Sequence, residues 1–432
     1  MLSLLIVLAI AASVAIGYTT KFNTGLIAIC FAYILGCFGL DMTTKALISK
    51  WPISIFFVIM AVTLFYNFAL VNGTLEKLAL HVIYALRGMP RILPFVLFAA
   101  ATLIAALGAG YYTVLAFMAP ITLLLCDKIN MSKLVGAVAI NCGALVGANF
   151  MTSASGMIFR GLMENSGYAE PAFKYSTGIF FSTLCYSIIL IAFFLFIPKA
   201  NRNIGKDMTV SKPEPFDPRQ RINLWLIVIM VVVVLVPPVL HLIVPGSATI
   251  KFINSRIDVG LVGIIMTVIA LFFRLADEKQ VVAKVPWGTL IMICGVGMLI
   301  SVAIEAGTLK ILANWIGNKI PAHIVPIAMG LVASFMSFFS STLGVVCPAL
   351  FPLVPGLAEA MGINPMLLFI CVVVGSQSSA ISPFSSGGSL VLGSCSSDEE
   401  RNKLFPRLIF IAVPVSIVLA VAVNAVITVL LK

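Results

Sequence analysis

The sequence predicts an all-α polytopic membrane protein made of two inverted repeats. Each repeat is expected to hold five transmembrane helices, a re-entrant hairpin and a broken helix. Of the 432 residues, 61% are apolar and only 10% are charged, and apolar runs of about 17–25 residues can cross a hydrocarbon core of about 30 Å. The motif NGTLEKLA at Asn72 returns as AGTLKILA at Ala306, 234 positions later. Such self-similarity indicates an internal duplication.

Apolar runs mark ten candidate spans, five in each half. In chain order they are 2–17, 24–40, 51–71, 134–163 and 172–197, then 222–243, 258–275, 286–305, 362–395 and 404–430. An odd number of spans makes the second copy start on the opposite side of the membrane from the first. The repeats are therefore expected to be inverted.

Two further features lie between the third and fourth span of each half. The segments 74–87 and 308–319 carry charges within a helical pattern, which favours helices lying along the interface. The segments 91–127 and 323–357 are apolar but interrupted by small residues near their middle. We interpret them as re-entrant hairpins.

Basic residues set the expected topology. With both termini outside, the inner connections hold 18 of the 27 Lys and Arg residues, in keeping with the positive-inside rule. This topology explains the net charge of +11 better than nucleic-acid binding does. The domains are then a first repeat over 1–198, a cytoplasmic linker over 199–221 and a second repeat over 222–432, in the inner (plasma) membrane. The nine cysteines lack paired spacing and are read as packing residues.

Four segments break the regularity of the spans and form two pairs. Two are hairpin turns, Leu107–Pro120 and Phe339–Pro352, and two are helix interruptions, Gly147–Gly156 and Ser382–Gly393. Unwound backbone is tolerated at membrane depth only where it lines a cavity enclosed by protein. Helix-packing glycines are the plainer explanation for any one segment. Four segments in two matched pairs favour a central binding site of a secondary transporter.

The polar residues of these segments form the predicted site. Helix N-termini offer N–H groups and positive partial charge to an anion, and hydroxyls and carbonyls offer oxygen ligands to a hard cation. The expected substrate-binding residues are Tyr112, Thr113, Asn149, Thr152, Ser153, Ser341, Thr342, Ser385 and Ser386. The expected ligands of a coupling Na⁺ are Ser340, Ser341, Thr342 and Ser382. No catalytic residue and no other cofactor is predicted.

Several motifs resemble a known family. SSTLGVVCPALFPLVPGL, the preceding VPWGTLIMICGVGMLI and the paired broken helices are similar to the MatC-type malonate/dicarboxylate carriers of the ion transporter superfamily. The resemblance extends over essentially the whole chain and is most specific between Pro286 and Gly393. It implies a homodimer in which each protomer has a scaffold part and a mobile transport part that moves as an elevator.

The related divalent anion/sodium symporters carry Ser-Asn-Thr at each hairpin tip, which this chain does not keep. The triplet falls on Thr342–Gly344, with Ser341 just before, and on Gly110–Tyr112, followed by Thr113. The first copy departs most. The resemblance therefore implies that any sodium site is stronger at the second hairpin, and that a tyrosine hydroxyl has taken over a polar contact at the first.

Charge placement limits the coupling mechanism. All 16 acidic residues fall in connections or near helix ends, so no carboxylate is placed to relay protons at membrane depth. Coupling to Na⁺, or to a proton carried by the substrate, fits better. Arg160 is the one cation close behind a broken helix, and we interpret it as reaching toward the interface rather than pairing with a substrate carboxylate.

The sequence thus favours a carrier of a small organic anion, a C3–C6 dicarboxylate, within the lipid bilayer. An inorganic-ion or cation/proton exchanger of the same superfamily is the alternative. An intramembrane enzyme would need a nucleophile and base at depth, and no His, Lys or Asp lies within reach of the serines by this topology. A channel differs from a carrier in showing neither saturation nor counterflow.

Overall fold

The computed structural model describes residues 2–20, 22–85, 92–128, 131–196, 212–244, 247–308, 311, 319–339, 341–395 and 397–431. All regular structure in these ranges is helical. The first half contains α1 (Leu2–Thr20), α2 (Thr24–Tyr33), η1 (Ile34–Gly39), α3 (Thr44–Ile48), α4 (Ile53–Val71), α5 (Thr74–Ala85), α6 (Leu93–Ile104), η3 (Ala105–Ala109), α7 (Tyr111–Lys128), α8 (Lys133–Ala148), α9 (Ala154–Asn165) and α10 (Ala172–Phe196).

The second half repeats much of this order. It contains α11 (Pro218–Ile243), α12 (Ala248–Arg256), α13 (Val259–Phe272), α14 (Glu278–Ala283), α15 (Trp287–Glu305), α17 (Val325–Phe339), η4 (Thr342–Val346), α18 (Cys347–Leu350), η5 (Phe351–Leu353), α19 (Val354–Met361), α20 (Pro365–Ser378), α21 (Ser386–Gly393), α22 (Asp398–Arg407), η6 (Leu408–Ala412) and α23 (Val413–Leu430). Many helices begin at a polar cap; Asp217, for example, forms a capping box with Gln220 at the start of α11.

Within the described residues, five helical segments are long and apolar enough to cross a membrane. They are Ala172–Leu195, Pro218–Pro237, Trp287–Glu305, Thr342–Met361 and Asp398–Leu430. α12 and α13 meet at a bend of 64°, and counting this pair as one span raises the number of candidate spans to six. Thr342–Met361 falls mostly in the segment expected to be a re-entrant hairpin, 323–357, and not in an expected span. The remaining expected spans coincide with shorter apolar helices of 10–17 residues, and two of them, 134–163 and 362–395, are each divided into two helices. The bent start at α12 was not predicted.

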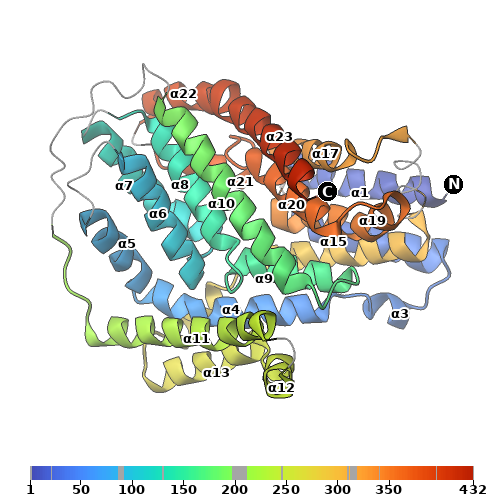
Figure 1. Ribbon diagram of the computed structural model, residues 1–432, viewed down its shortest axis with the longest axis horizontal. Helices are drawn as coiled ribbons and strands as arrows, with labels where there is room; N and C mark the ends of the chain where they lie inside the picture. Colours follow the sequence, from blue (N-terminus) through green and yellow to red (C-terminus); the bar gives the residue numbers. More distant parts are fainter. Residues whose placement is uncertain are drawn as a thin grey trace.

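One group of helices packs through glycines. α4 lies against α13, and α2 lies against α15; Figure 1 shows α11 and α13 running beside α4. A Cβ on Gly25 would lie 2.3 Å from the carbonyl oxygen of Ile291, and one on Gly263 would lie 3.1 Å from that of Ala61. Only small residues permit such close approach between membrane helices.

A second group surrounds α8 and α20. α6 packs on α8, and α17 packs on α20. α10 covers both α8 and α20, whereas α23 covers α17 and α20 (Figure 1). A Cβ on Gly147 would lie 2.1 Å from the carbonyl oxygen of Thr102, and one on Gly375 would lie 2.1 Å from that of Gly330. The carboxyl-terminal ends of α8 and α20 therefore lie close to the interrupted segment that precedes each of them in the chain, η3 before α8 and η4 before α20.

The interruptions are shorter than expected. In the first segment the helix breaks only around Gly108 (φ 103°) and Gly110 (φ 72°), and α7 begins at Tyr111. Left-handed φ values suit glycine because it has no Cβ. In the second, η4 starts at Thr342, capped by the Ser341 hydroxyl. Pro120 and Pro352, expected in the turns, lie inside helices.

Some predictions fall on parts of the chain that are not described. Of the expected interfacial helices, 74–87 corresponds to α5, which is described to Ala85, whereas of 308–319 only residues 308, 311 and 319 are described. The linker 199–221 is described only from residue 212. All nine cysteines are free.

Candidate functional site

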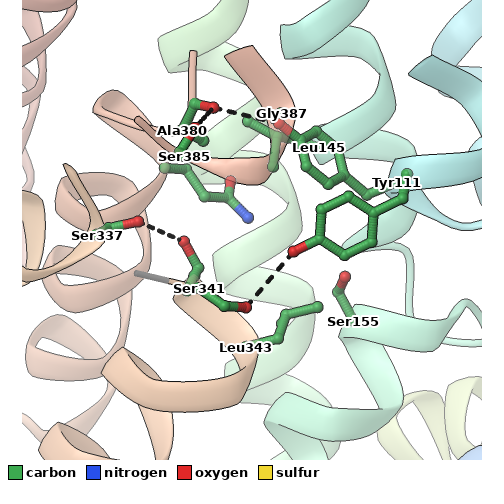
Figure 2. A pocket seen from close by; sticks show the side chains of 12 residues that line it. Tyr111, Leu145, Ser155, Ser337, Ser341, Leu343, Ala380, Ser385 and Gly387 are labelled. Atoms are coloured by element: carbon green, nitrogen blue, oxygen red, sulfur yellow. Dashed lines mark hydrogen bonds between the residues drawn. The ribbon is translucent and has the colours of Figure 1, made fainter. Parts of the chain in front are cut away.

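A small cavity lies where the interrupted segments meet. Its volume is about 30 Å³, which is space for about two water molecules. It is lined by Tyr111, Tyr112, Leu145, Ser155, Ser337, Ser341, Thr342, Leu343, Gln377, Ala380, Ser385 and Gly387. Figure 2 shows Tyr111, Ser155, Ser341 and Ser385 around it, each from a different element. None of the lining side chains carries a charge.

Four helix N-termini meet at this cavity. Tyr111 is the first residue of α7, and Thr342 is the first of the continuous helical segment Thr342–Met361. Ser155 lies in the first turn of α9, while Ser385 caps α21 and Gly387 lies in its first turn. The first N–H groups of a helix have no intrahelical partner and carry positive partial charge. The cavity is therefore suited to an anion although no lysine or arginine lines it.

The two hairpin tips touch each other across the cavity. The hydroxyl oxygens of Tyr112 and Ser341 are 3.5 Å apart. Behind the second tip, the hydroxyls of Thr342 and Ser337 are 2.9 Å apart, and the Ser341 hydroxyl also accepts a hydrogen bond from the Gly344 N–H at 3.1 Å. Contact between the tips leaves room for only about two waters, and we call this conformation closed.

Tyr111 joins the first tip to the second broken helix. Its buried hydroxyl donates to Asn141 Oδ1 at 2.7 Å and lies 3.4 Å from the carbonyl oxygen of Ala380. A Cβ on Gly387 would lie 1.8 Å from that hydroxyl oxygen, so only glycine fits there while the tyrosine stays in place. The sequence located Tyr111 at the tip but did not place it among the binding residues.

Of the predicted substrate-binding residues, the cavity collects four: Tyr112, Ser341, Thr342 and Ser385. For Ser386 only the backbone, at the start of α21, is described. Thr113, Asn149, Thr152 and Ser153 do not line the cavity. These four follow or flank the turns, but their side chains point elsewhere in the closed conformation.

The residues of the first break are used internally. The Ser153 hydroxyl donates to the carbonyl oxygen of Ala105 at 2.7 Å and ties the break to the first hairpin. Asn149 is fully buried and exchanges hydrogen bonds with Gln377. Thr152 is also fully buried. For Ser153 and Asn149, the difference from the predicted binding role has a simple physical cause, since polar groups at a buried break need partners within the protein.

The predicted sodium ligands are only partly assembled. Ser340 lies outside the described residues, and the Ser382 hydroxyl accepts a hydrogen bond from the Phe384 N–H at 3.2 Å. Hydroxyls do gather behind the second tip. Ser334 and Ser378 hydroxyl oxygens are 3.0 Å apart, and the Ser379 hydroxyl donates to the Ser334 carbonyl at 2.7 Å. In the described ranges no three His, Cys, Asp or Glu side chains cluster, so the available ligands there are neutral oxygens.

Sequence reasoning missed several lining residues. Ser155 and Ser337 are single hydroxyls beside the predicted turns, and Gln377 is a carboxamide inside the long apolar segment 362–395. A glutamine in such a run was the available signal, because an amide is costly to bury without a partner. Arg160 is 3.7 Å from Glu164 and 5.7 Å from the Phe173 ring centre, and it does not line the cavity.

A larger crevice of about 920 Å³ lies on the far side of the second hairpin. The loop from Ser49 to Pro52 and one face of α15 form one wall. The end of α9 and the prolines Pro348, Pro352 and Pro355 form the other. Lys50 and Glu305 form an ion pair near its rim. The crevice separates the α4/α15 group from the group that holds the small cavity.

Solved structures share this fold. The YdaH transporter of Alcanivorax borkumensis matches with a TM-score of 0.57 at 15% sequence identity, covering 89% of this chain and 86% of that one. MtrF of Neisseria gonorrhoeae, described as illuminating a class of antimetabolite efflux pumps, matches with a TM-score of 0.61 at 12% identity, covering 93% and 85%. At these identities the likeness concerns the fold alone. A search of curated proteins finds no significant match.

The chain is a multi-pass membrane protein with the fold of solved membrane transporters. Residues 1–148 match the family model described as dicarboxylate carrier protein MatC N-terminus. The resemblance to MatC-type carriers is therefore confirmed. The match lies in the first third of the chain, whereas the motifs that suggested it lie mostly in the second half.

Proposed function

We propose that the protein is a secondary active transporter of a small organic anion, a C3–C6 dicarboxylate. The convergence of four helix N-termini on a small, uncharged cavity is the observation that carries this proposal. Helix termini bind carboxylates without a counter-charge of their own. The family of residues 1–148 is one of dicarboxylate carriers, which favours two carboxylates over one.

The finer architecture belongs to the same proposal: two inverted repeats, 1–198 and 222–432, joined by a cytoplasmic linker. Matched packing supports it. Gly147 lies against Thr102 as Gly375 lies against Gly330, and α4 pairs with α13 as α15 pairs with α2. The third span of each half thus packs against the second span of the other half, as two-fold related repeats require.

Transport would proceed by an elevator movement. The α4/α15 group is the scaffold, and the group around α8 and α20 carries the small cavity. The crevice of about 920 Å³ between them gives the mobile part space to move. In the proposed topology the crevice opens to the outside. Substrate enters when the contact between Tyr112 and Ser341 opens, because the closed cavity holds only about two waters.

Coupling is proposed to use Na⁺ at the second hairpin or a proton carried by the substrate. The hydroxyls around Ser334, Ser337 and Thr342 supply the neutral oxygens that a hard cation prefers. The first tip offers phenol and backbone groups instead. A homodimer in the inner (plasma) membrane completes the proposal.

A ligand screen tests this function. Malonate, succinate, glutarate, adipate, citrate and matched monocarboxylates are added to purified protein with and without Na⁺, since a bound ligand raises the melting temperature by mass action. A shift with C3–C6 dicarboxylates, followed by saturable counterflow in proteoliposomes, is expected. Na⁺ or pH-driven ion flux without any organic substrate would instead establish an inorganic-ion or cation/proton exchanger. Non-saturating flux would identify a channel.

The topology is tested separately. Ser211, outside the described residues, lies in the proposed cytoplasmic linker. A Ser211→Cys variant should not react with an impermeant thiol reagent applied to intact cells, and should react after permeabilisation. Ready labelling of intact cells would show that the linker lies outside the cell and that the orientation of the chain is the reverse of the proposed one.

A further inference from the structure

A pair of buried carboxamides lies directly behind the cavity. Gln377, near the end of α20, lines the cavity and is 5% exposed, and Asn149, just after α8, is fully buried. Gln377 Nε2 donates to Asn149 Oδ1 at 2.9 Å, and Asn149 Nδ2 donates to Gln377 Oε1 at 3.0 Å. The two interrupted helices are thus joined amide to amide, across 228 positions of sequence.

Thr183 on α10 fixes the orientation of both carboxamide groups, that is, the positions of their oxygen and nitrogen atoms. Its hydroxyl donates to the carbonyl oxygen of Ile179 at 2.9 Å, so its single hydrogen is used within its own helix. Toward Asn149, at 3.1 Å, the Thr183 oxygen can only accept. Asn149 must therefore present its nitrogen to Thr183 and its oxygen to Gln377. This order in turn requires Gln377 to donate through Nε2.

One hydrogen of the Gln377 amide remains for the cavity. An NH₂ group has two hydrogens, and among the described residues Nε2 has one recorded acceptor, Asn149. Both Asn149 hydrogens are engaged, by Thr183 and Gln377. The fixed amide thus leaves a donor on the only carboxamide that lines the cavity.

We infer that Gln377 is the specificity-determining side chain that donates a hydrogen bond to a substrate carboxylate, and that Asn149 and Thr183 are positioning residues that hold it in the donating orientation. This inference rests on the proposed function and adds to it. In a site without lysine or arginine, a donor that cannot flip is what distinguishes a carboxylate oxygen from a group that itself donates. Removing the donor should abolish its hydrogen bond to the anion. Releasing the orientation of the amide should only weaken that hydrogen bond.

Binding of radiolabelled malonate and succinate to the purified full-length protein tests the inference. Gln377→Met keeps the length of the side chain but lacks the amide, and should raise Kd tenfold or more for whichever acid the wild type binds. Thr183→Val removes the acceptor at nearly constant shape and should raise Kd about threefold, while Thr183→Ser, which keeps the hydroxyl, should match the wild type. Combining Gln377→Met with Thr183→Val should add nothing to Gln377→Met alone.

A matched control is available on α23, which packs against α20. Asn424 is a carboxamide that is 2% exposed and donates to the Cys371 carbonyl of α20 at 3.3 Å, but it does not line the cavity. Asn424→Leu should change the melting temperature and leave Kd within twofold. An unchanged Kd in folded Gln377→Met overturns the inference.

The threonine pair decides the matter if Gln377→Met does not fold. Equal Kd values for Thr183→Val and Thr183→Ser would then overturn the inference. Failure of the wild type to bind any carboxylate in the screen is a different result. It would overturn the proposed function and the inference with it.

Discussion

The two hairpin tips occupy comparable places but differ in chemistry. Both are beside a short π-helical turn, η3 at the first and η4 at the second; such turns are often found at functional sites. The first tip has glycines and two tyrosines, and a Cβ on Gly108 would lie 1.9 Å from the Tyr66 ring. The second has Ser341 and Thr342 backed by further hydroxyls.

The tips also make different contacts. Tyr111 of the first donates to Asn141 in its own half of the chain and lies 3.4 Å from the Ala380 carbonyl oxygen in the other half. Thr342 of the second contacts Ser337 on the helix just before it. In the two proposed repeats, both tips keep a backbone break, but the first carries large phenols where the second carries small hydroxyls. The first tip then fills space, and the second keeps the oxygens for a ligand.

The largest effect is expected from Gly387→Ala, which tests the space-filling role of the first tip. The new methyl would lie 1.8 Å from the Tyr111 hydroxyl and 2.7 Å from the Ala380 carbonyl, and overpacking of this kind costs about 1–3 kcal/mol. Transport should be lost and the melting temperature lowered. Adding Tyr111→Phe should restore part of both. Gly393→Ala on the same helix has nothing within 4 Å and is the control; equal effects at the two glycines would contradict the prediction.

Loss of a hydroxyl should cost more at the second tip than at the first. Thr342→Ala at the second tip should weaken substrate affinity by about 1–2 kcal/mol if it removes a hydrogen bond to a charged group, and Ser386→Ala at the start of α21 should do the same. Thr113→Ala, after the first tip, should have less than half that effect because Thr113 does not line the cavity. Thr342→Ser should preserve affinity. Unchanged kinetics in both the Thr342→Ala and the Ser386→Ala variants would place the site elsewhere.

The cation requirement offers a further contrast. If Na⁺ drives uptake, one ion per cycle is expected, because hydroxyls gather at the second tip only. Transport into proteoliposomes under separate Na⁺ and pH gradients should then give a Hill coefficient for Na⁺ near one. A value clearly above one would show that the first tip binds an ion as well.

The smallest effect is expected from Arg160→Gln. Arg160 pairs loosely with Glu164 at 3.7 Å and lies outside the cavity lining, so recognition of the anion should rest on helix termini and neutral donors. The Kd for substrate should stay within about twofold, measured on folded protein. Complete loss of binding would make Arg160 a primary ligand.

Much of the architecture could be predicted because membrane burial imposes strong patterns. The apolar runs gave the helices, and glycine-rich breaks at Gly108–Gly110 and near Asn149 located the interruptions within a few residues. The hydroxyl-rich second tip was also recognised, since Ser341 and Thr342 line the cavity. The exact length of each turn was not, because helical backbone resumes directly after Gly110 at the first tip and directly after the capping residue Ser341 at the second.

By itself, the sequence determined that the chain is a membrane transporter with paired interruptions and few charges at depth. Only the tertiary structure decided which polar groups face the cavity. Asn149 and Gln377 show the reason, because both are amides at interrupted helices. Asn149 donates both of its amide hydrogens to Thr183 and Gln377, whereas Gln377 lies at the cavity wall. A sequence records which groups must be satisfied when buried, but the partner of each depends on how helices more than 200 residues apart pack together.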